Sequence, residues 1–143
     1  MAESSIVHGC LVEIEGTGIL IVGDPGVGKT SVCLELARLG HDFIADDAVE
    51  IRRTGRRIVG SSPAVTRSML AIRGVGIRSM KCERDSTEIA LIVELLNDES
   101  TVLPLILDDL LLSIPRLTLR SAVLTETAGV IEALARSSSE AVI

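Results

Sequence analysis

The apolar residues in the first half of the chain occur in short runs separated by turn residues. "IVHGCLVEI" at 6–14 and "GILIV" at 18–22 are joined by "EGTG", which predicts the two strands of a β-hairpin. Over 30–39 the apolar residues recur at helical spacing, and Gly40 is placed to end that helix. "HDFIA" at 41–45 is typical of a short buried strand. The pattern therefore predicts two strands, a helix and a third strand, in that order.

The second half of the chain continues with strand-like runs and closes on a helical pattern. Several hairpins beside helices indicate an α/β fold whose sheet is mixed rather than purely parallel. The pattern assigns no element to 97–112. The expected elements are a hairpin over 49–63 that turns at Gly55, strands over 86–95 and 114–119, and a helix over 125–137 capped by Thr125 or Thr127.

Length and composition limit the classes of function. The 143 residues are enough for one hydrophobic core, so we expect a single domain over 1–143. The net charge of −6 argues against nucleic acid as a partner, because nucleic-acid binding relies on basic groups. Base stacking also needs aromatic side chains, and Phe43 is the only aromatic residue in the sequence.

The sequence also argues against a secreted or membrane protein. The first ten residues lack a basic start followed by an apolar block, and acidic residues such as Glu94, Asp98 and Asp108 interrupt the longer apolar runs. The three cysteines show no C-x-x-C spacing, so neither a zinc site nor a disulfide framework is expected. We interpret them as small buried thiols, and the chain as a cytoplasmic protein without a membrane partner.

Residues 23–30, "GDPGVGKT", fit the phosphate-loop pattern G-x-x-x-x-G-K-[ST] and lie between a predicted strand and a predicted helix. In this pattern glycines let backbone N–H groups turn toward phosphate oxygens, and the start of the helix adds the positive end of its dipole. Lys29 is expected to reach the β- and γ-phosphates of ATP, and the Thr30 hydroxyl is expected to bind Mg²⁺. The candidate nucleotide-binding residues are Gly23, Asp24, Pro25, Gly26, Val27, Gly28, Lys29 and Thr30.

Two adjacent carboxylates, Asp46 and Asp47, follow the next predicted strand. Neighbouring side chains of an extended chain point to opposite sides. One carboxylate is then placed to hold Mg²⁺ or its waters while the other accepts a proton from an attacking hydroxyl. A solvated turn pair explains the same two residues equally well.

Two histidines have structural explanations of their own. His8 is isolated in an apolar strand, where a packed and hydrogen-bonded side chain is more typical than a catalyst. His41 follows Gly40 at the predicted end of a helix, where a cation interacts favourably with the last carbonyl groups.

The segments "VHG", "GDPGVGKT", "LELARLGHDFIADDAVEI" and "IRGVGI" together resemble the catalytic domain of the bacterial HPr kinase/phosphorylase family. That family pairs a phosphate loop G-D-S-G-x-G-K-S with "RGH…ADDxVEI" and a later "LEIRGxGI". The resemblance covers residues 7–95, and "IPRLTL" is similar to a late strand of the family. It implies a phosphate-loop domain with a mixed sheet, similar to phosphoenolpyruvate carboxykinase, in a short form without the family's N-terminal domain.

The resemblance also implies an activity and a set of roles. The family uses ATP and Mg²⁺ to phosphorylate a serine of HPr, the phosphocarrier protein of the bacterial sugar phosphotransferase system, and its members form hexamers. By this resemblance Asp47 is the general base and Asp46 lies beside it near the metal. Lys29 and Thr30 keep their phosphate and metal roles, and His8 becomes a functional residue.

The sequence departs from the family pattern at several places, and two of them bear directly on the activity. Ala71 stands in "LAIRG" where the family has a metal-binding glutamate, and the segment V-R-P-G-R-N, linked to dephosphorylation, is absent after "IPRLTL". Together they argue against full bifunctional activity, so the leading hypothesis is a kinase without strong phosphorylase activity. Ala71 by itself favours an ATP-binding regulator. Two alternatives stay open: a kinase for another acceptor, and an ATP-binding regulator with reduced or lost catalysis.

Overall fold

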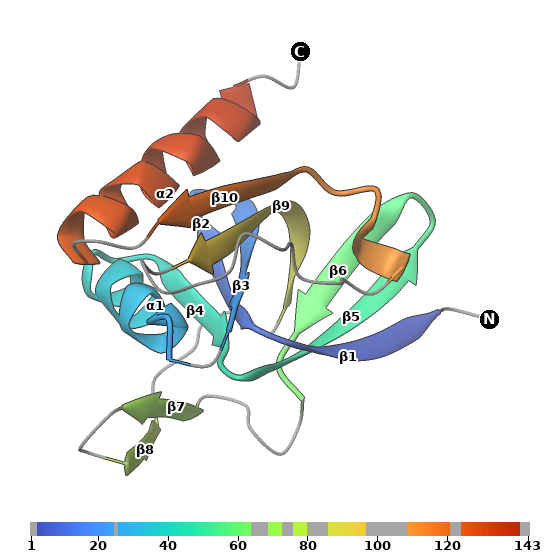
Figure 1. Cartoon of the computed structure of the whole chain (residues 1–143). Helices are drawn as coiled ribbons and strands as arrows, with labels where there is room; N and C mark the ends of the chain where they lie inside the picture. Colours follow the sequence, from blue (N-terminus) through green and yellow to red (C-terminus); the bar gives the residue numbers. More distant parts are fainter. Residues whose placement is uncertain are drawn as a thin grey trace.

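The computed structural model describes residues 3–24, 26–63, 69–72, 76–79, 86–96, 109–120 and 124–140. Pro25 and the part of the unassigned segment over 97–108 lie outside the described residues. The elements, drawn in Figure 1, are β1 (Ser4–His8), β2 (Cys10–Ile14), β3 (Thr17–Gly23), α1 (Lys29–Arg38), β4 (Asp42–Ala45), β5 (Ala48–Thr54), β6 (Arg57–Ser61), β7 (Met69–Ile72), β8 (Gly76–Ser79), β9 (Ser86–Leu96), the 3₁₀ turn η1 (Asp109–Leu111), β10 (Arg116–Arg120) and α2 (Leu124–Glu140).

The main sheet is mixed, as the sequence predicts. It has eight strands in the order β1-β5-β6-β9-β3-β2-β4, with β10 also paired to β9. β9 runs parallel to β3 and to β10, and the other pairs of this sheet are antiparallel. β7 and β8 form a separate two-stranded hairpin, which lies beside α1 (Figure 1).

The long strand β9 joins the two halves of the sheet. Its first residues, Ser86–Glu88, pair with β6, while its later residues pair with β3 along one edge and with β10 along the other. The sheet curls, so that β6 approaches β2. A Cβ added at Gly60 of β6 would lie 2.7 Å from the Leu11 side chain of β2, which explains a glycine at this position.

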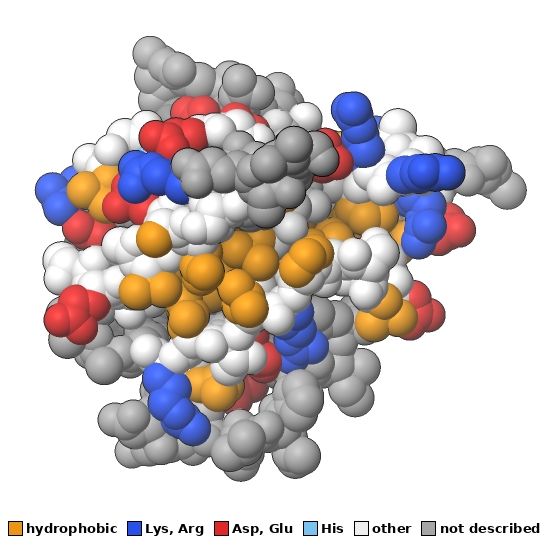
Figure 2. Space-filling view, turned by 90° about the horizontal axis from the view of Figure 1, so that it is seen from above, with side chains coloured by type: hydrophobic (Ala, Val, Ile, Leu, Met, Phe, Trp, Pro, Cys, Tyr) orange, Lys and Arg blue, Asp and Glu red, His pale blue; other side chains and the backbone are white. Residues whose placement is uncertain are grey.

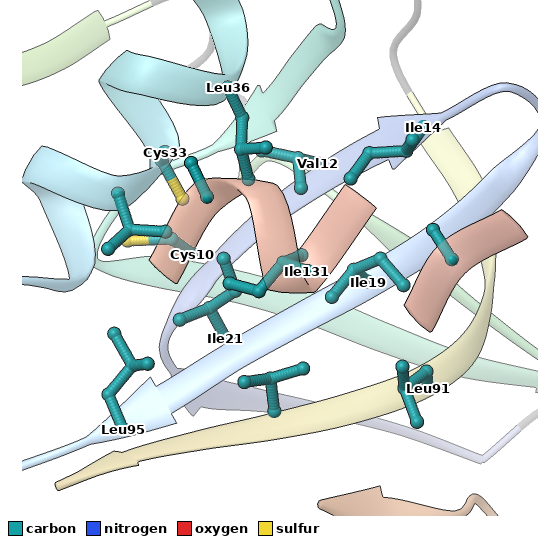
Figure 3. Close-up of a cluster of buried hydrophobic side chains, with 14 of the residues drawn as sticks. Cys10, Val12, Ile14, Ile19, Ile21, Cys33, Leu36, Leu91, Leu95 and Ile131 are labelled. Carbon is teal, nitrogen blue, oxygen red and sulfur yellow. The ribbon is translucent and has the colours of Figure 1, made fainter. Parts of the chain in front are cut away.

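Alternating residues of the central strands fill two separate cores. Cys10, Val12 and Ile14 of β2 point to one face, where they pack with side chains of β3, β9, α1 and α2 (Figure 3). Leu11 of the same strand faces the other core, with residues of β3, β4, β5, β6 and η1. Because both faces of β2 and β3 are covered, these strands are apolar almost throughout.

The first hairpin turns at Glu15 and Gly16. Ile14 pairs with Thr17, and the two turn residues have φ angles of 49° and 85°. Two consecutive left-handed residues form the turn type whose twist matches that of the flanking strands. The second expected hairpin also forms, with β5 and β6 joined at Gly55, whose φ is 65°.

Helix α1 ends as the sequence predicts. The Gly40 N–H donates to the Ala37 carbonyl at 3.0 Å and the His41 N–H donates to the Leu36 carbonyl at 3.1 Å. This pair of bonds is the Schellman arrangement, in which the left-handed residue after the cap is usually glycine. Gly40 has a φ of 99°, which a glycine adopts without strain.

The prediction of one strand over 6–14 is wrong. The chain changes partner at Gly9, so that β1 pairs with β5 while β2 pairs with β3 and β4. The Gly9 N–H donates to the Asp47 carbonyl at 3.3 Å, and a Cβ at this position would lie 2.8 Å from the Ile21 carbonyl oxygen. Close approach of two backbones therefore requires glycine here.

Two further expectations fail at the helices. Helix α2 begins at Leu124, so Thr125 and Thr127 lie inside its first turn and neither is its N-cap. The His41 side chain does not cap α1 through its carbonyl groups. Its Nε2 lies 2.6 Å from a carboxylate oxygen of Glu132, and this contact links the end of α1 to α2.

The surface exposes some large apolar side chains. Figure 2 shows hydrophobic groups gathered near the middle of one face, with lysine and arginine side chains mainly toward its edges. Over the described residues the exposed large apolar side chains include Ile6, Leu112, Leu117 and Val130. No helix within these residues is long and apolar enough to cross a membrane.

Candidate active site

The topology brings the candidate residues to one edge of the sheet. β3 and β4 both run antiparallel to β2, so their carboxyl ends lie at the same edge, and β9 runs parallel to β3 and ends there too. The glycine-rich loop over 24–28 follows β3, and Asp46 and Asp47 follow β4. Ligands of open α/β sheets bind beyond the carboxyl ends of the strands.

The loop has the backbone geometry that its glycines permit. Gly26 and Gly28 have φ angles of 87° and 102°, and a Cβ added at either position would meet nothing within 4 Å. The positive φ angles therefore explain these glycines, and contacts of a side chain do not. Among the described residues, nothing occupies the space beside them. α1 starts directly after Gly28, which makes no side-chain cap, so the first N–H groups of the helix face the loop.

Lys29 crosses back over the loop. Its Nζ donates to the carbonyl oxygens of Gly23 at 2.7 Å and Asp24 at 3.1 Å. These bonds hold the ammonium group on the loop, although Lys29 is the first residue of α1. An ammonium in this position is close to any anion bound by the loop.

Asp46 is buried and joined to the loop side of the site. It is 6% exposed, and its Oδ1 accepts hydrogen bonds from the Thr30 hydroxyl at 3.0 Å and from the Cys10 thiol at 2.9 Å. Because the Thr30 hydroxyl donates its proton to the carboxylate, its lone pairs are available to a cation. The two residues that the sequence predicts as metal ligands are therefore in direct contact.

Asp47 has the opposite environment. Its side chain is 78% exposed, and its φ is 68°. The Ala48 N–H donates to the Asp46 carbonyl at 2.8 Å, which makes Asp47 the centre of a γ-turn of the rarer, positive-φ kind. Strained backbone at a non-glycine residue is found most often at functional sites. The prediction that the two aspartates point in different directions is consistent with this contrast in burial.

His8 is not the packed strand residue that its sequence context favours. Its side chain is 87% exposed, and its Nδ1 lies 3.5 Å from Oδ1 of Asp47. Register explains the contact, because His8 is the last residue of β1 and pairs with Ala48, the residue after Asp47. The structure thus brings His8 and Asp47 together, which their separation in the sequence does not reveal.

Sequence reasoning missed Cys10, whose thiol contacts Asp46. Cys33 of α1 lies beside it, and Figure 3 shows both thiols between β2 and α1. Burial raises the pKa of the Cys33 thiol well above its usual value, and a hydrogen bond with Cys10 adds to the shift. Cys33 is therefore a protonated thiol at neutral pH. No signal in the sequence ties either cysteine to the site, because the contact depends on how β2, α1 and β4 pack.

Pro25 and Ala71, which the sequence singles out, are not part of the side-chain geometry of the site described above. Pro25 of the loop lies outside the described residues. Ala71 lies in β7 opposite Ile77 of β8, and only its backbone is described. Within the described residues no group of three or more His, Cys, Asp or Glu side chains is arranged to hold a metal ion.

Comparison with known proteins places the chain in a family. The family model described as "HPr Serine kinase C-terminal domain" matches residues 1–139. The chain belongs to this family. An HPr kinase/phosphorylase of Clostridium botulinum (strain Eklund 17B / Type B) is 48% identical over 77 residues, which cover 54% of this chain and 25% of that protein.

Two further comparisons support the assignment and the fold. An HPr kinase/phosphorylase of Exiguobacterium sp. (strain ATCC BAA-1283 / AT1b) is 45% identical over 104 residues, covering 68% of this chain and 33% of the relative. The structure titled "Structure of the Hpr(Ser) kinase/phosphatase from Coxiella burnetii" matches with a TM-score of 0.76 at 23% identity, over 93% of this chain and 89% of that one. The chain thus has the mixed α/β fold with a curled sheet seen there, and its matches span a quarter to a third of these curated relatives.

Proposed function

We propose that this chain transfers the γ-phosphoryl group of ATP to a serine hydroxyl of HPr, the phosphocarrier protein of the sugar phosphotransferase system. The observation that carries the proposal is the hydrogen bond between Thr30 and Asp46, at 3.0 Å. It joins a loop with the phosphate-binding pattern to the pair of aspartates that the family pattern makes catalytic. Family membership supports HPr as the acceptor.

The loop residues bind the nucleotide in this proposal. Backbone N–H groups of 26–28 and the start of α1 surround the phosphates, and Lys29 exchanges its bonds to Gly23 and Asp24 for phosphate oxygens. The open space beside Gly26 and Gly28 fits a group that approaches the backbone closely. We also propose that the domain is a phosphate-loop fold of the phosphoenolpyruvate carboxykinase type.

Mg²⁺ fits the donor set at Thr30 and Asp46. This ion usually keeps several waters and takes only one or two protein groups together with substrate phosphates, so a cluster of three acidic side chains is not required. The Thr30 hydroxyl and the Asp46 carboxylate would hold it, directly or through water. When bound, the ion neutralises negative charge on the phosphates.

Asp47 performs the proton transfer. Its exposed carboxylate accepts the proton of the serine hydroxyl as the oxygen attacks the γ-phosphorus. His8, 3.5 Å away, restrains the position of that carboxylate. Exposure of both side chains suits a site whose acceptor is another protein.

Four further properties belong to the proposal. The activity is that of a kinase without strong phosphorylase action, and the protein works in the bacterial cytoplasm. Residues 1–143 form one domain. The chain forms a homo-oligomer, most simply a hexamer. Exposed apolar groups such as Ile6 and Leu112, at 65% and 72%, supply surface that an assembly would cover. Light scattering at micromolar concentration tests the assembly, and a monomeric mass would contradict it.

The test of the function is incubation with HPr and γ-labelled ATP, with Mg²⁺ and with EDTA. We expect label on HPr only with Mg²⁺, and none on an HPr variant whose acceptor serine is alanine. ATP binding without transfer to any acceptor would instead support the regulator that Ala71 favours. Transfer to a different protein from a cell extract, but not to HPr, would support another acceptor.

The loop is tested separately through Lys29→Ala. Removing the ammonium group takes a cation from the β- and γ-phosphates, so ATP affinity should fall by about tenfold or more. Isothermal titration calorimetry measures the change. Arg38→Ala is a matched control on the exposed end of α1, because its partner is Glu35 and not the loop, and it should bind ATP like the wild type. Unchanged affinity in Lys29→Ala would rule out the loop as the main site.

A further inference from the structure

The Cys10 thiol contacts Asp46, and the proposed function gives it no role. Cys10 is 1% exposed and belongs to the apolar core between the sheet and the helices, where a cysteine ordinarily acts as a small hydrophobic residue. Its Sγ, however, lies 2.9 Å from Oδ1 of Asp46. A thiol this close to a carboxylate oxygen is a hydrogen-bond donor.

Asp46 needs donors because it is a buried carboxylate. A buried charge is costly unless it is hydrogen-bonded or paired. Both Thr30 and Cys10 donate to the same oxygen, Oδ1, from opposite elements, α1 and β2. Two donors on one oxygen, coming from two different elements, restrict the rotation of the carboxylate, and Cys10 supplies one of the two.

Cys33 of α1 is a further neighbour of the Cys10 thiol. Burial keeps the Cys33 thiol protonated by raising its pKa, and its hydrogen bond is made with Cys10. The Cys10 thiol donates to Asp46 at 2.9 Å. The two thiols and the carboxylate therefore form a chain that runs from α1 through β2 to the end of β4.

We propose that Cys10 is a positioning residue that holds the Asp46 carboxylate in the orientation needed to bind Mg²⁺ with the nucleotide. It acts through Asp46 and touches neither substrate nor metal. The inference rests on the proposed function, which gives Asp46 its metal role. Hydrogen bonds that orient a metal-binding side chain in this way are commonly worth 10- to 100-fold in metal affinity.

Substitutions at Cys10 separate positioning from packing because the two roles predict opposite orders. Cys10→Val removes the donor but keeps an apolar side chain in an apolar core. Cys10→Ser keeps a donor but places a hydroxyl in that core. A packing role predicts that valine is the better substitute, whereas a positioning role predicts that serine is the better one for metal binding.

The readout is binding, not turnover. Calorimetry measures the affinity for a nonhydrolysable ATP analogue with and without Mg²⁺, and thermal unfolding measures stability. Without Mg²⁺, we expect Cys10→Val to bind the analogue with the wild-type affinity. To reach the same Mg²⁺-dependent increase in affinity, this variant should need about tenfold more Mg²⁺ than the wild type. Cys10→Ser should need about the wild-type Mg²⁺ concentration, within about twofold, even if it unfolds at a lower temperature.

Val12→Ala is the matched control. Val12 lies two residues along the same strand in the same core, is fully buried and has no part in the contact with Asp46. It should lower the unfolding temperature without changing the Mg²⁺ dependence. Wild-type Mg²⁺ dependence in Cys10→Val would overturn the role of Cys10 while leaving the proposed function intact. A wild-type protein in which Mg²⁺ does not strengthen binding of the analogue would contradict the metal site itself, and the role of Cys10 with it.

Discussion

Asp46 and Asp47 are neighbours in the chain but occupy opposite environments. Asp46 is buried and accepts hydrogen bonds from Thr30 and Cys10, while the Asp47 side chain is 78% exposed and lies 3.5 Å from His8. The γ-turn centred on Asp47 produces the difference, because it turns the chain sharply between β4 and β5. Two residues of the same type thus have different surroundings: one carboxylate is fixed on the loop side, and the other is exposed at the surface.

The largest expected effect separates proton transfer from nucleotide binding. Asp47→Asn is nearly isosteric, and asparagine tolerates positive φ, so the turn should be kept. Removing a general base typically costs 10²- to 10⁴-fold in rate, and we expect a loss of this size in transfer to serine. ATP affinity, measured by calorimetry, should stay within a few-fold of the wild type. Rapid transfer by this variant would show that the base lies elsewhere, with Asp46 the next candidate.

The second effect concerns stability and should be larger at the buried residue. Asp46→Ala leaves the Thr30 and Cys10 donors without their acceptor, at a cost of about 1–3 kcal/mol in the free energy of unfolding. Asp47→Ala removes an exposed side chain with one weak contact and should cost less than about 1 kcal/mol. Urea unfolding of both variants measures the difference. If both variants lost the same free energy of unfolding, the buried hydrogen bonds of Asp46 would contribute no more to stability than the contact of the exposed Asp47.

The smallest expected effect concerns the strained turn. At a φ of 68° a glycine avoids the clash that a Cβ causes, although it also increases the freedom of the unfolded chain. We expect Asp47→Gly to be more stable than Asp47→Ala, by about 0.5–1 kcal/mol. Both variants lack the carboxylate, so neither should transfer phosphate at a useful rate. A less stable glycine variant would show that the turn is not strained.

Local rules predict the elements whose causes lie within a few residues. The hairpin at Gly55, the end of α1 at Gly40 and the strands β9 and β10 follow from turn residues and apolar runs. The break at Gly9 does not, because the residues on both sides are apolar and the break arises where β1 leaves for a distant partner, β5. Thr125 and Thr127 fail as caps because several polar residues near a helix start satisfy the same pattern.

The candidate site likewise has features that the sequence predicts and features that it does not. The loop and the two aspartates are contiguous motifs, and the sequence locates them. Their environments are not visible there: the contacts of Asp46 with Cys10 and of Asp47 with His8 join residues that lie more than thirty positions apart. Such contacts depend on strand pairing and on which face of a strand is buried.

The division of roles between the two aspartates is tested most directly by measuring single-turnover transfer to HPr over a range of Mg²⁺ concentrations. Asp46→Asn should transfer slowly at low Mg²⁺ and recover much of its rate as Mg²⁺ rises, because the substitution weakens the hold on the ion. Asp47→Asn should stay slow at every Mg²⁺ concentration, because added metal does not replace a base. Recovery of Asp47→Asn by Mg²⁺, with Asp46→Asn slow throughout, would reverse the roles and contradict the account.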